Sequence, residues 1–251
     1  MNPWNRPAAA TQSQSAAVDA GLRSYMLKIY NYMTSGVLLT GIVAWFVAQA
    51  AVTTAGQDGQ MVLTDFGNAI FLSPLKWLVI LAPLGMVIAI SAGINRMSAG
   101  TLQACFWAFA VLMGVSLSSI YLQYTGHSIA VIFFVTAGMF GGMSMLGYTT
   151  KRDLTGMGHF LIMGLWGVIL TSLVNMFLIK SSPLDFAMSV LCVFIFVGLI
   201  AYDTQKLKAI YYQVGGAGEA ASRAAIMGAL RLYLDFINLF LSLMRIFGDR
   251  R

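Results

Sequence analysis

Two aspartates, Asp203 and Asp235, are the acidic residues of this chain that fall inside long apolar segments. Of the nine acidic residues, six others lie in polar segments or near the chain ends. Asp185 closely follows Pro183, a position typical of an acid at the start of a helix. Ionisable side chains within apolar, membrane-type segments are costly and usually functional. Asp203 and Asp235 are therefore the candidates for chemistry.

A pair of carboxyl groups in a partly desolvated space has a characteristic chemistry. Both groups cannot ionise at low cost, so the two tend to share one proton. A neighbouring arginine opposes this sharing, because it can pair with whichever carboxylate is charged. When the pair opens, its oxygens form a hard-ligand site suited to a divalent cation such as Ca²⁺. The pair is expected to act as a proton-sensitive latch.

The composition identifies the setting in which these residues act. Hydrophobic residues make up 59% of the 251 residues and charged residues only 10%, whereas an average soluble domain has roughly 25% charged residues. This excludes a soluble globular protein, a disordered chain and a nucleic-acid-binding domain. The sequence predicts an all-α polytopic membrane protein. The net charge of +6 then bears on orientation in the membrane, with no nucleic-acid partner implied.

Seven apolar segments are long enough to cross a bilayer. They lie at about 33–52, 76–94, 102–122, 128–147, 158–179, 184–202 and 228–247. The division of the chain is expected to be a flexible polar N-terminal tail at 1–22 and a seven-helix transmembrane domain at 23–251.

The basic residues predict the orientation. If the segments alternate, one side holds nine of them: Arg6, Arg23, Lys28, Arg96, Lys151, Arg152, Lys206, Lys208 and Arg223. The other side holds only Lys76 and Lys180, so the N-terminus is predicted to be cytoplasmic. Arg245, Arg250 and Arg251 would then emerge outside, against the rule. A re-entrant last segment is the alternative, but 236–247 is apolar enough that we favour a seventh crossing.

This topology brings three ionisable residues to one level. Asp203 would lie at the cytoplasmic end of the sixth span, Asp235 two turns into the seventh, and Arg96 at the end of the second. The alternative is that Asp203 faces the cytoplasmic water and Asp235 pairs with Arg231, one turn earlier on the same helix.

Two motifs resemble a known family. The segment FVGLIAYDTQ at 196–205 resembles the signature of the Bax inhibitor-1 family, and ALRLYLDFINLF at 229–240 is similar to that family's last helix. The resemblance implies a seven-helix fold with the last helix surrounded by the other six. It also implies a pH-sensitive calcium leak controlled by an aspartate pair, here Asp203 and Asp235. Bacterial members are linked to membrane quality-control proteases, and animal members to suppression of cell death.

Three further residues are expected to affect the pair. Arg96 resembles the family's latch arginine, which would hold the closed state. Arg231 departs from the family pattern, and its charge would hold Asp235 ionised and weaken the switch. His159, predicted on the same side, would modulate the titration of the two aspartates.

Other classes of function compete with a leak. A serine protease would need a nucleophile paired with histidine, and neither His127 nor His159 accompanies a Gly-x-Ser-x-Gly element. A zinc protease would need an HExxH motif, which the chain does not contain. An aspartyl protease would need both acids deep in the membrane, so no enzyme is expected. A proton-coupled transporter also uses paired acids, but it requires a substrate cavity. A non-conducting regulator of a membrane protease or of cell survival is the other alternative.

The sequence thus predicts a proton-gated calcium leak in a multi-pass protein, with the bacterial inner membrane as its expected location. Its expected partners are the lipid bilayer, Ca²⁺, protons and, as the alternative, a membrane protease. No resident cofactor is expected, because Ca²⁺ would be the permeating ion.

Overall fold

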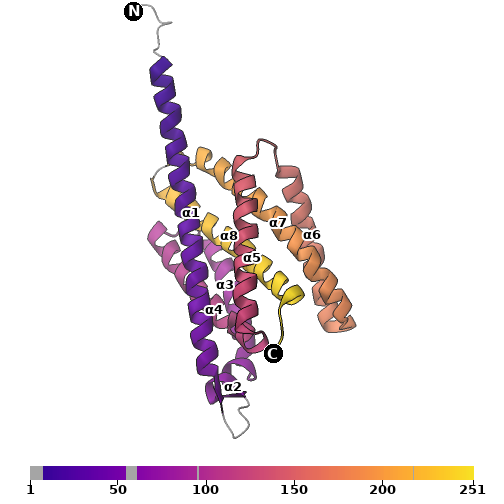
Figure 1. Ribbon diagram of the computed structural model, residues 1–251. Helices are drawn as coiled ribbons and strands as arrows, with labels where there is room; N and C mark the ends of the chain where they lie inside the picture. The colour runs from indigo at the N-terminus through magenta and orange to yellow at the C-terminus, as the bar shows by residue number, and fades with distance from the viewer. Residues whose placement is uncertain (1–7, 55–60, 95, 217) are drawn as a thin grey trace, which may run out of the picture.

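The computed structural model describes residues 8–54, 61–94, 96–216 and 218–251, and it is built almost entirely of helices (Figure 1). Seven of the helices in these ranges are long and apolar enough to cross a membrane. They are α1 (Ala8–Ala51), α3 (Leu75–Gly93), α4 (Ala99–Gln123), α5 (Gly126–Thr149), α6 (Thr155–Val174, continued by the π-helical turn Asn175–Ile179), α7 (Ser182–Gln213) and α8 (Gly218–Phe247). The predicted all-α polytopic membrane fold is confirmed.

The long connection between α1 and α3 contains structure of its own. Strands β1 (Val52–Thr54) and β2 (Met61–Leu63) pair antiparallel, and a short helix α2 (Asp65–Phe71) follows. Thr64 begins α2, because its side-chain oxygen accepts a hydrogen bond from the amide of Gly67. This connection therefore folds back against the end of α1.

Several helices extend beyond the apolar segments that predicted them. Residues 8–22, within the predicted flexible polar tail, belong to α1, and this alanine-rich stretch has no proline and meets its first glycine at Gly21. Residues 1–7 of the predicted tail lie outside the described residues. Similarly, α7 continues past Tyr202 to Gln213, and α8 begins at Gly218, well before the predicted start. The added turns are polar or amphipathic, so apolar length alone could not reveal them.

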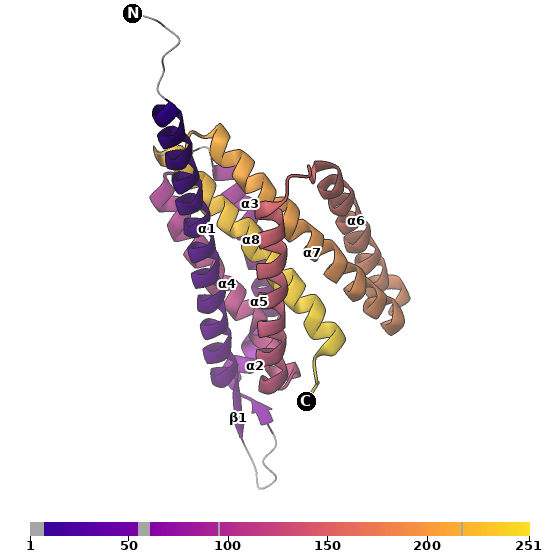
Figure 2. The ribbon, with the colours of Figure 1, turned by 45° about the horizontal axis from the view of Figure 1, so that its top comes forward.

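Helix α8 is the most buried of the seven. In the 18-residue apolar stretch of α8, 67% is buried, whereas in the corresponding stretch of every other candidate span at most 33% is buried. It packs against α1, α4, α5 and α7. Helices α3 and α6 pack mainly on α4 and α7, and α6 lies to one side of the bundle (Figure 2). A last helix surrounded by all six others therefore remains a prediction.

The C-terminus lies beside the connection between α4 and α5. Arg250 forms a β-bridge with Tyr124, and the amide of Thr125 donates to the carbonyl of Asp249 at 3.0 Å. Because α8 starts next to the end of α7 and finishes at this connection, it runs from one end of the bundle to the other. This arrangement fits a seventh crossing better than a re-entrant segment.

Candidate functional site

The two predicted aspartates lie together between α7 and α8. Asp203 is 7% exposed and Asp235 is 5% exposed, and both side chains line the same cavity. Helix α7 continues from Asp203 to Gln213, which is about 15 Å of helix. Asp203 is therefore buried in the bundle, and the alternative in which it faces water at the end of a span is wrong in this structure.

Arg231 pairs with the acid of the neighbouring helix. Its Nη1 atom lies 3.3 Å from Oδ1 of Asp203, and its side chain is 45% exposed against 10% for Asp203. Pairing with Asp235, one turn along the same helix, is therefore not what the structure contains. Among the described residues, Oδ2 of Asp235 is buried and has no hydrogen-bond partner. The pair is thus asymmetric, because only Asp203 contacts a cation.

The acids face a cavity of about 630 Å³ bounded by α6, α7 and α8. Arg231, Asp235 and Asn238 reach it from one face of α8, because residues spaced by four and three lie on the same side of a helix. Asp203 and Lys206 reach it from α7. Helix α6 supplies the opposite wall, which is largely apolar and includes Leu165, Val168 and Ile169. The cavity therefore has one charged wall and one apolar wall.

The residues that follow Asp203 fix α7 to its neighbours. The hydroxyl of Thr204 lies 3.1 Å from that of Ser144 on α5, which in turn lies 2.5 Å from the hydroxyl of Tyr30 on α1. Gln205 holds the connection between α5 and α6, because its amide donates to the carbonyl of Arg152 and accepts from the amide of Leu154. These contacts are not predicted by spacing along the sequence, although polar side chains next to Asp203 in an apolar helix are a signal for them.

Tyr202, on the other side of Asp203, packs where α6 comes close. A Cβ atom at Gly158 would lie 2.4 Å from the Tyr202 ring, so only glycine fits there without a shift. On α5, a Cβ atom at Gly147 would lie 2.2 Å from the carbonyl oxygen of Ala201. These two close approaches set the position of the Asp203 backbone.

Tyr233 fixes the position of α8 close to Asp235. It is fully buried, and its hydroxyl lies 2.6 Å from that of Thr40 on α1. Because Thr40 already donates to the carbonyl of Ala110 at 2.8 Å, the Tyr233 hydroxyl must be the donor. This chain of bonds ties α8 to α1 and α4 two residues before the acid.

The structure does not bring Arg96 or His159 to the acid pair. Arg96 is exposed in the connection between α3 and α4, and His159 is exposed in the first turn of α6. Neither residue forms an ion pair with Asp203 or Asp235, whereas Arg231 pairs with Asp203. The latch role of Arg96 and the modulating role of His159 remain predictions, and Arg231 holds the position expected of a latch.

Ca²⁺ would find only part of a coordination shell here. In the described ranges, no three or more His, Cys, Asp or Glu side chains gather as metal ligands. The two carboxyl groups offer at most four oxygens, whereas Ca²⁺ takes roughly six to eight. Water and backbone oxygens would have to supply the rest.

Comparison with known proteins gives a family and several similar bacterial proteins. The family model described as "Inhibitor of apoptosis-promoting Bax1" matches residues 22–251. The inner membrane protein YbhL of Escherichia coli K12 is 50% identical over 233 residues, covering 92% of this chain and 94% of its own. A protein of Rickettsia prowazekii is 48% identical over 244 residues and 96% of each chain. A protein of Caulobacter vibrioides is 43% identical over 254 residues and the full length of both. This multi-pass membrane protein therefore belongs to the Bax inhibitor-1 family.

Proposed function

We propose that this protein is a pH-sensitive calcium leak of the membrane, in which Asp203 and Asp235 share a proton and line the ion path. The observation that carries the proposal is the asymmetric pair: two buried carboxyl groups face one cavity, and a single cation contacts one of them. Buried carboxyl groups are rarely retained at such cost unless they have a function.

The charge count gives the proposed switch its direction. With one shared proton, the acid pair carries one negative charge, and the cations of the cavity are Arg231, which contacts Asp203, and Lys206. Loss of that proton leaves Asp235 as a carboxylate that no cation contacts, and this carboxylate attracts a divalent cation. Ca²⁺ must then compete with Arg231 for Asp203, so Arg231 is the proposed latch in place of Arg96. Proton loss and displacement of the Arg231 guanidinium together would open the path.

The proposed location is the bacterial inner membrane with the N-terminus in the cytoplasm. The relative in Escherichia coli carries the printed name of an inner membrane protein. The ends of the helices near Arg23, Lys151 and Lys208 form the basic end of the bundle, which suits the cytoplasmic side.

The cavity also favours a second candidate, a proton-coupled transporter of a small solute. Its volume of about 630 Å³ lies within the roughly 300–1,000 Å³ typical of ligand sites. In that case the acids would exchange a proton against a substrate held near the apolar wall of α6.

Flux into liposomes tests the proposal. Purified full-length protein is reconstituted around a calcium dye, and influx is followed across a pH series for wild type, Asp203→Asn and Asp235→Asn. Asp19→Asn, which alters an exposed carboxyl group on α1, is the matched control. We expect a leak whose pH dependence is lost or displaced in both site variants and kept in the control.

Folded wild-type protein that passes no Ca²⁺ above empty liposomes would overturn the leak. Solute uptake driven by a pH gradient, in the absence of calcium flux, would identify the transporter. The absence of both calcium flux and solute uptake would overturn both candidates and favour a non-conducting regulator of a membrane protease.

A further inference from the structure

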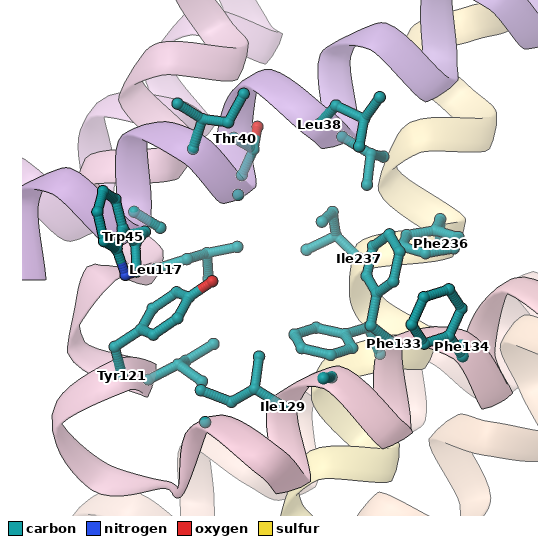
Figure 3. A pocket seen from close by; sticks show the side chains of 18 of the residues that line it. Leu38, Thr40, Trp45, Leu117, Tyr121, Ile129, Phe133, Phe134, Phe236 and Ile237 are labelled. Atoms are coloured by element: carbon teal, nitrogen blue, oxygen red, sulfur yellow. The ribbon is translucent and has the colours of Figure 1, made fainter.

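An apolar groove runs along the bundle between α1 and α5, on the face of α8 turned away from the acid pair. It consists of two cavities of about 550 and 640 Å³. The two cavities share lining residues from three helices: Val37 and Leu38, Phe133, and Phe236. Figure 3 shows the first cavity, with the side chains of Leu38, Phe133, Phe236 and Ile237 around the open space. The shared residues place the two cavities next to each other along α8, and together they are called the groove.

The groove opens toward the surroundings of the bundle. Helices α1 and α5 form its walls and both pack on α8, but they make no extensive contact with each other. Large apolar side chains stand exposed along its rim, including Leu38 at 54%, Phe134 at 73% and Met145 at 70%. In a membrane protein such a rim meets acyl chains, so a lipid can enter from the side.

The two ends of the groove differ in charge. Arg23 is exposed and lines the 640 Å³ cavity, and it forms no ion pair with any residue that the structure describes. On the facing wall is Tyr148, whose ring centroid lies 4.9 Å from Nζ of Lys208. The exposed residues Lys151 and Arg152 follow directly after α5. This end is therefore positively charged.

No equivalent charge lines the other end, where the residues include Trp45, Tyr121 and Ile129. Two acids lie near the basic end: Asp19, one turn before Arg23 on α1, and Asp153, whose carboxylate accepts a hydrogen bond from the amide of Thr155 at 2.9 Å. Asp19 forms no ion pair with Arg23 among the described residues. Asp153 forms no ion pair with Arg23 either. The charge pattern is thus that of an amphiphile with an anionic head and an apolar tail.

The length of the groove fits one leaflet of a bilayer. From Arg23 to Val37, α1 rises by about 21 Å, whereas half of the hydrocarbon core is about 15 Å thick. A phosphate group at Arg23 therefore leaves its acyl chain alongside the apolar part of the cavity, ending near Phe236.

We propose that the cavity beside Arg23 binds one anionic phospholipid, with the phosphate group at Arg23 and one acyl chain along the groove against α8. The charged end selects the anionic headgroup, and the apolar walls hold the chain. This lipid site is separate from the acid pair and does not depend on the proposed ion path.

Native mass spectrometry of the detergent-purified full-length protein tests the site. The protein is titrated with phosphatidylglycerol and, separately, with phosphatidylcholine carrying the same acyl chains. Two variants probe the site: Arg23→Gln removes the charge, and Gly141→Leu places a side chain in the groove. Their controls are Lys28→Gln, an exposed cation on the same helix outside this cavity, and Gly142→Leu, the next residue, which does not line it. A Cβ atom would meet nothing within 4 Å at either glycine.

We expect wild type and both controls to prefer phosphatidylglycerol by about fivefold, the effect of one interfacial charge. Arg23→Gln should bind the two lipids equally, and Gly141→Leu should bind both more weakly. An Arg23→Gln protein that keeps the preference would overturn the headgroup assignment. Equal binding by Gly141→Leu and Gly142→Leu, in proteins with unchanged circular dichroism, would overturn the groove.

Discussion

The two sides of α8 face cavities of similar volume but opposite chemistry. Toward α6 and α7 the helix presents Arg231 and Asp235 to a cavity of about 630 Å³. Toward α1 and α5 it presents Phe236 to cavities of about 550 and 640 Å³, and Ile237 lines the first of them. Size therefore does not distinguish a polar site from a lipid groove in this protein. What distinguishes them is which face of α8 carries ionisable side chains into a region where charge is costly.

The two sides also differ in what holds them together. On the apolar side, Phe236 packs edge-to-face against Phe133 and Phe140, with ring centroids 5.6 and 5.8 Å apart. On the polar side, α8 meets α7 through the ion pair between Arg231 and Asp203. Dispersion and edge-to-face contacts tolerate substitution by similar apolar groups. A buried charge left without its partner does not.

The largest contrast is expected between two neighbouring residues of α8. Asp235→Asn should make calcium flux flat against pH, because an amide cannot take part in sharing the proton. Phe236→Leu should leave the shape of that pH curve unchanged, since it alters only the apolar side. The measurement is dye-detected flux in liposomes over a pH series. Loss of the pH response in both variants would mean that the two sides are not independent.

Removing the latch cation should have the next largest effect. Arg231→Gln deletes the positive charge that favours ionised Asp203, so proton loss from the pair requires a higher pH. The midpoint of flux against pH should move upward by about one to three units. Arg223→Gln, on the same helix but outside the cavity, should leave the midpoint in place. A downward shift for Arg231→Gln would show that Arg231 does not act on the pair in this way.

Substitutions at two glycines of α5 should differ in their effect on the stability of the protein. Gly147→Ala pushes a methyl group into the backbone of α7 at Ala201 and should lower the unfolding free energy by about 1–3 kcal/mol. Gly141→Ala adds the same methyl group in the open groove and should cost nothing. Thermal unfolding in one detergent compares the two. Equal loss of stability would contradict the close approach of α5 and α7.

The smallest effect is expected outside the spans, in the connection between α5 and α6. Hydrogen bonds from Thr155 lower the pKa of the exposed Asp153 carboxyl below its ordinary value. A lowered pKa adds stability above the ordinary pKa, and this stability is lost as the pH falls through the folded-state value. Asp153→Asn should therefore lower Tm slightly at neutral pH and not at strongly acidic pH. A Tm difference that grows on acidification would contradict this sign.

Much of the fold and both central acids could be predicted from the sequence. Long apolar segments and sparse charge suffice to indicate a polytopic membrane protein, and an aspartate inside such a segment stands out. The partner of Arg231 could not be predicted in the same way. Spacing along one helix indicates which residues are neighbours on that helix, but Arg231 reaches across to Asp203 on α7. That contact depends on how α7 and α8 are rotated against each other.

The polar extensions and the groove escaped prediction for related reasons. Residues 203–213 of α7 are helical but not apolar, so a search for apolar segments ends too early and places Asp203 at an edge. The groove arises because α1 and α5 both pack on α8 but make no extensive contact with each other, although the hydroxyls of Tyr30 and Ser144 join them at one point. No local pattern in either helix encodes that gap.

The central claim is that Asp203 and Asp235 share a proton whose release opens the ion path. Infrared difference spectroscopy of the reconstituted protein can follow the stretching band of the protonated carboxyl group as pH changes. We predict one carboxyl band that titrates at the midpoint of the flux curve and is absent or displaced in both Asp203→Asn and Asp235→Asn. A band unchanged in both variants, or one that titrates far from the flux midpoint, would contradict the claim.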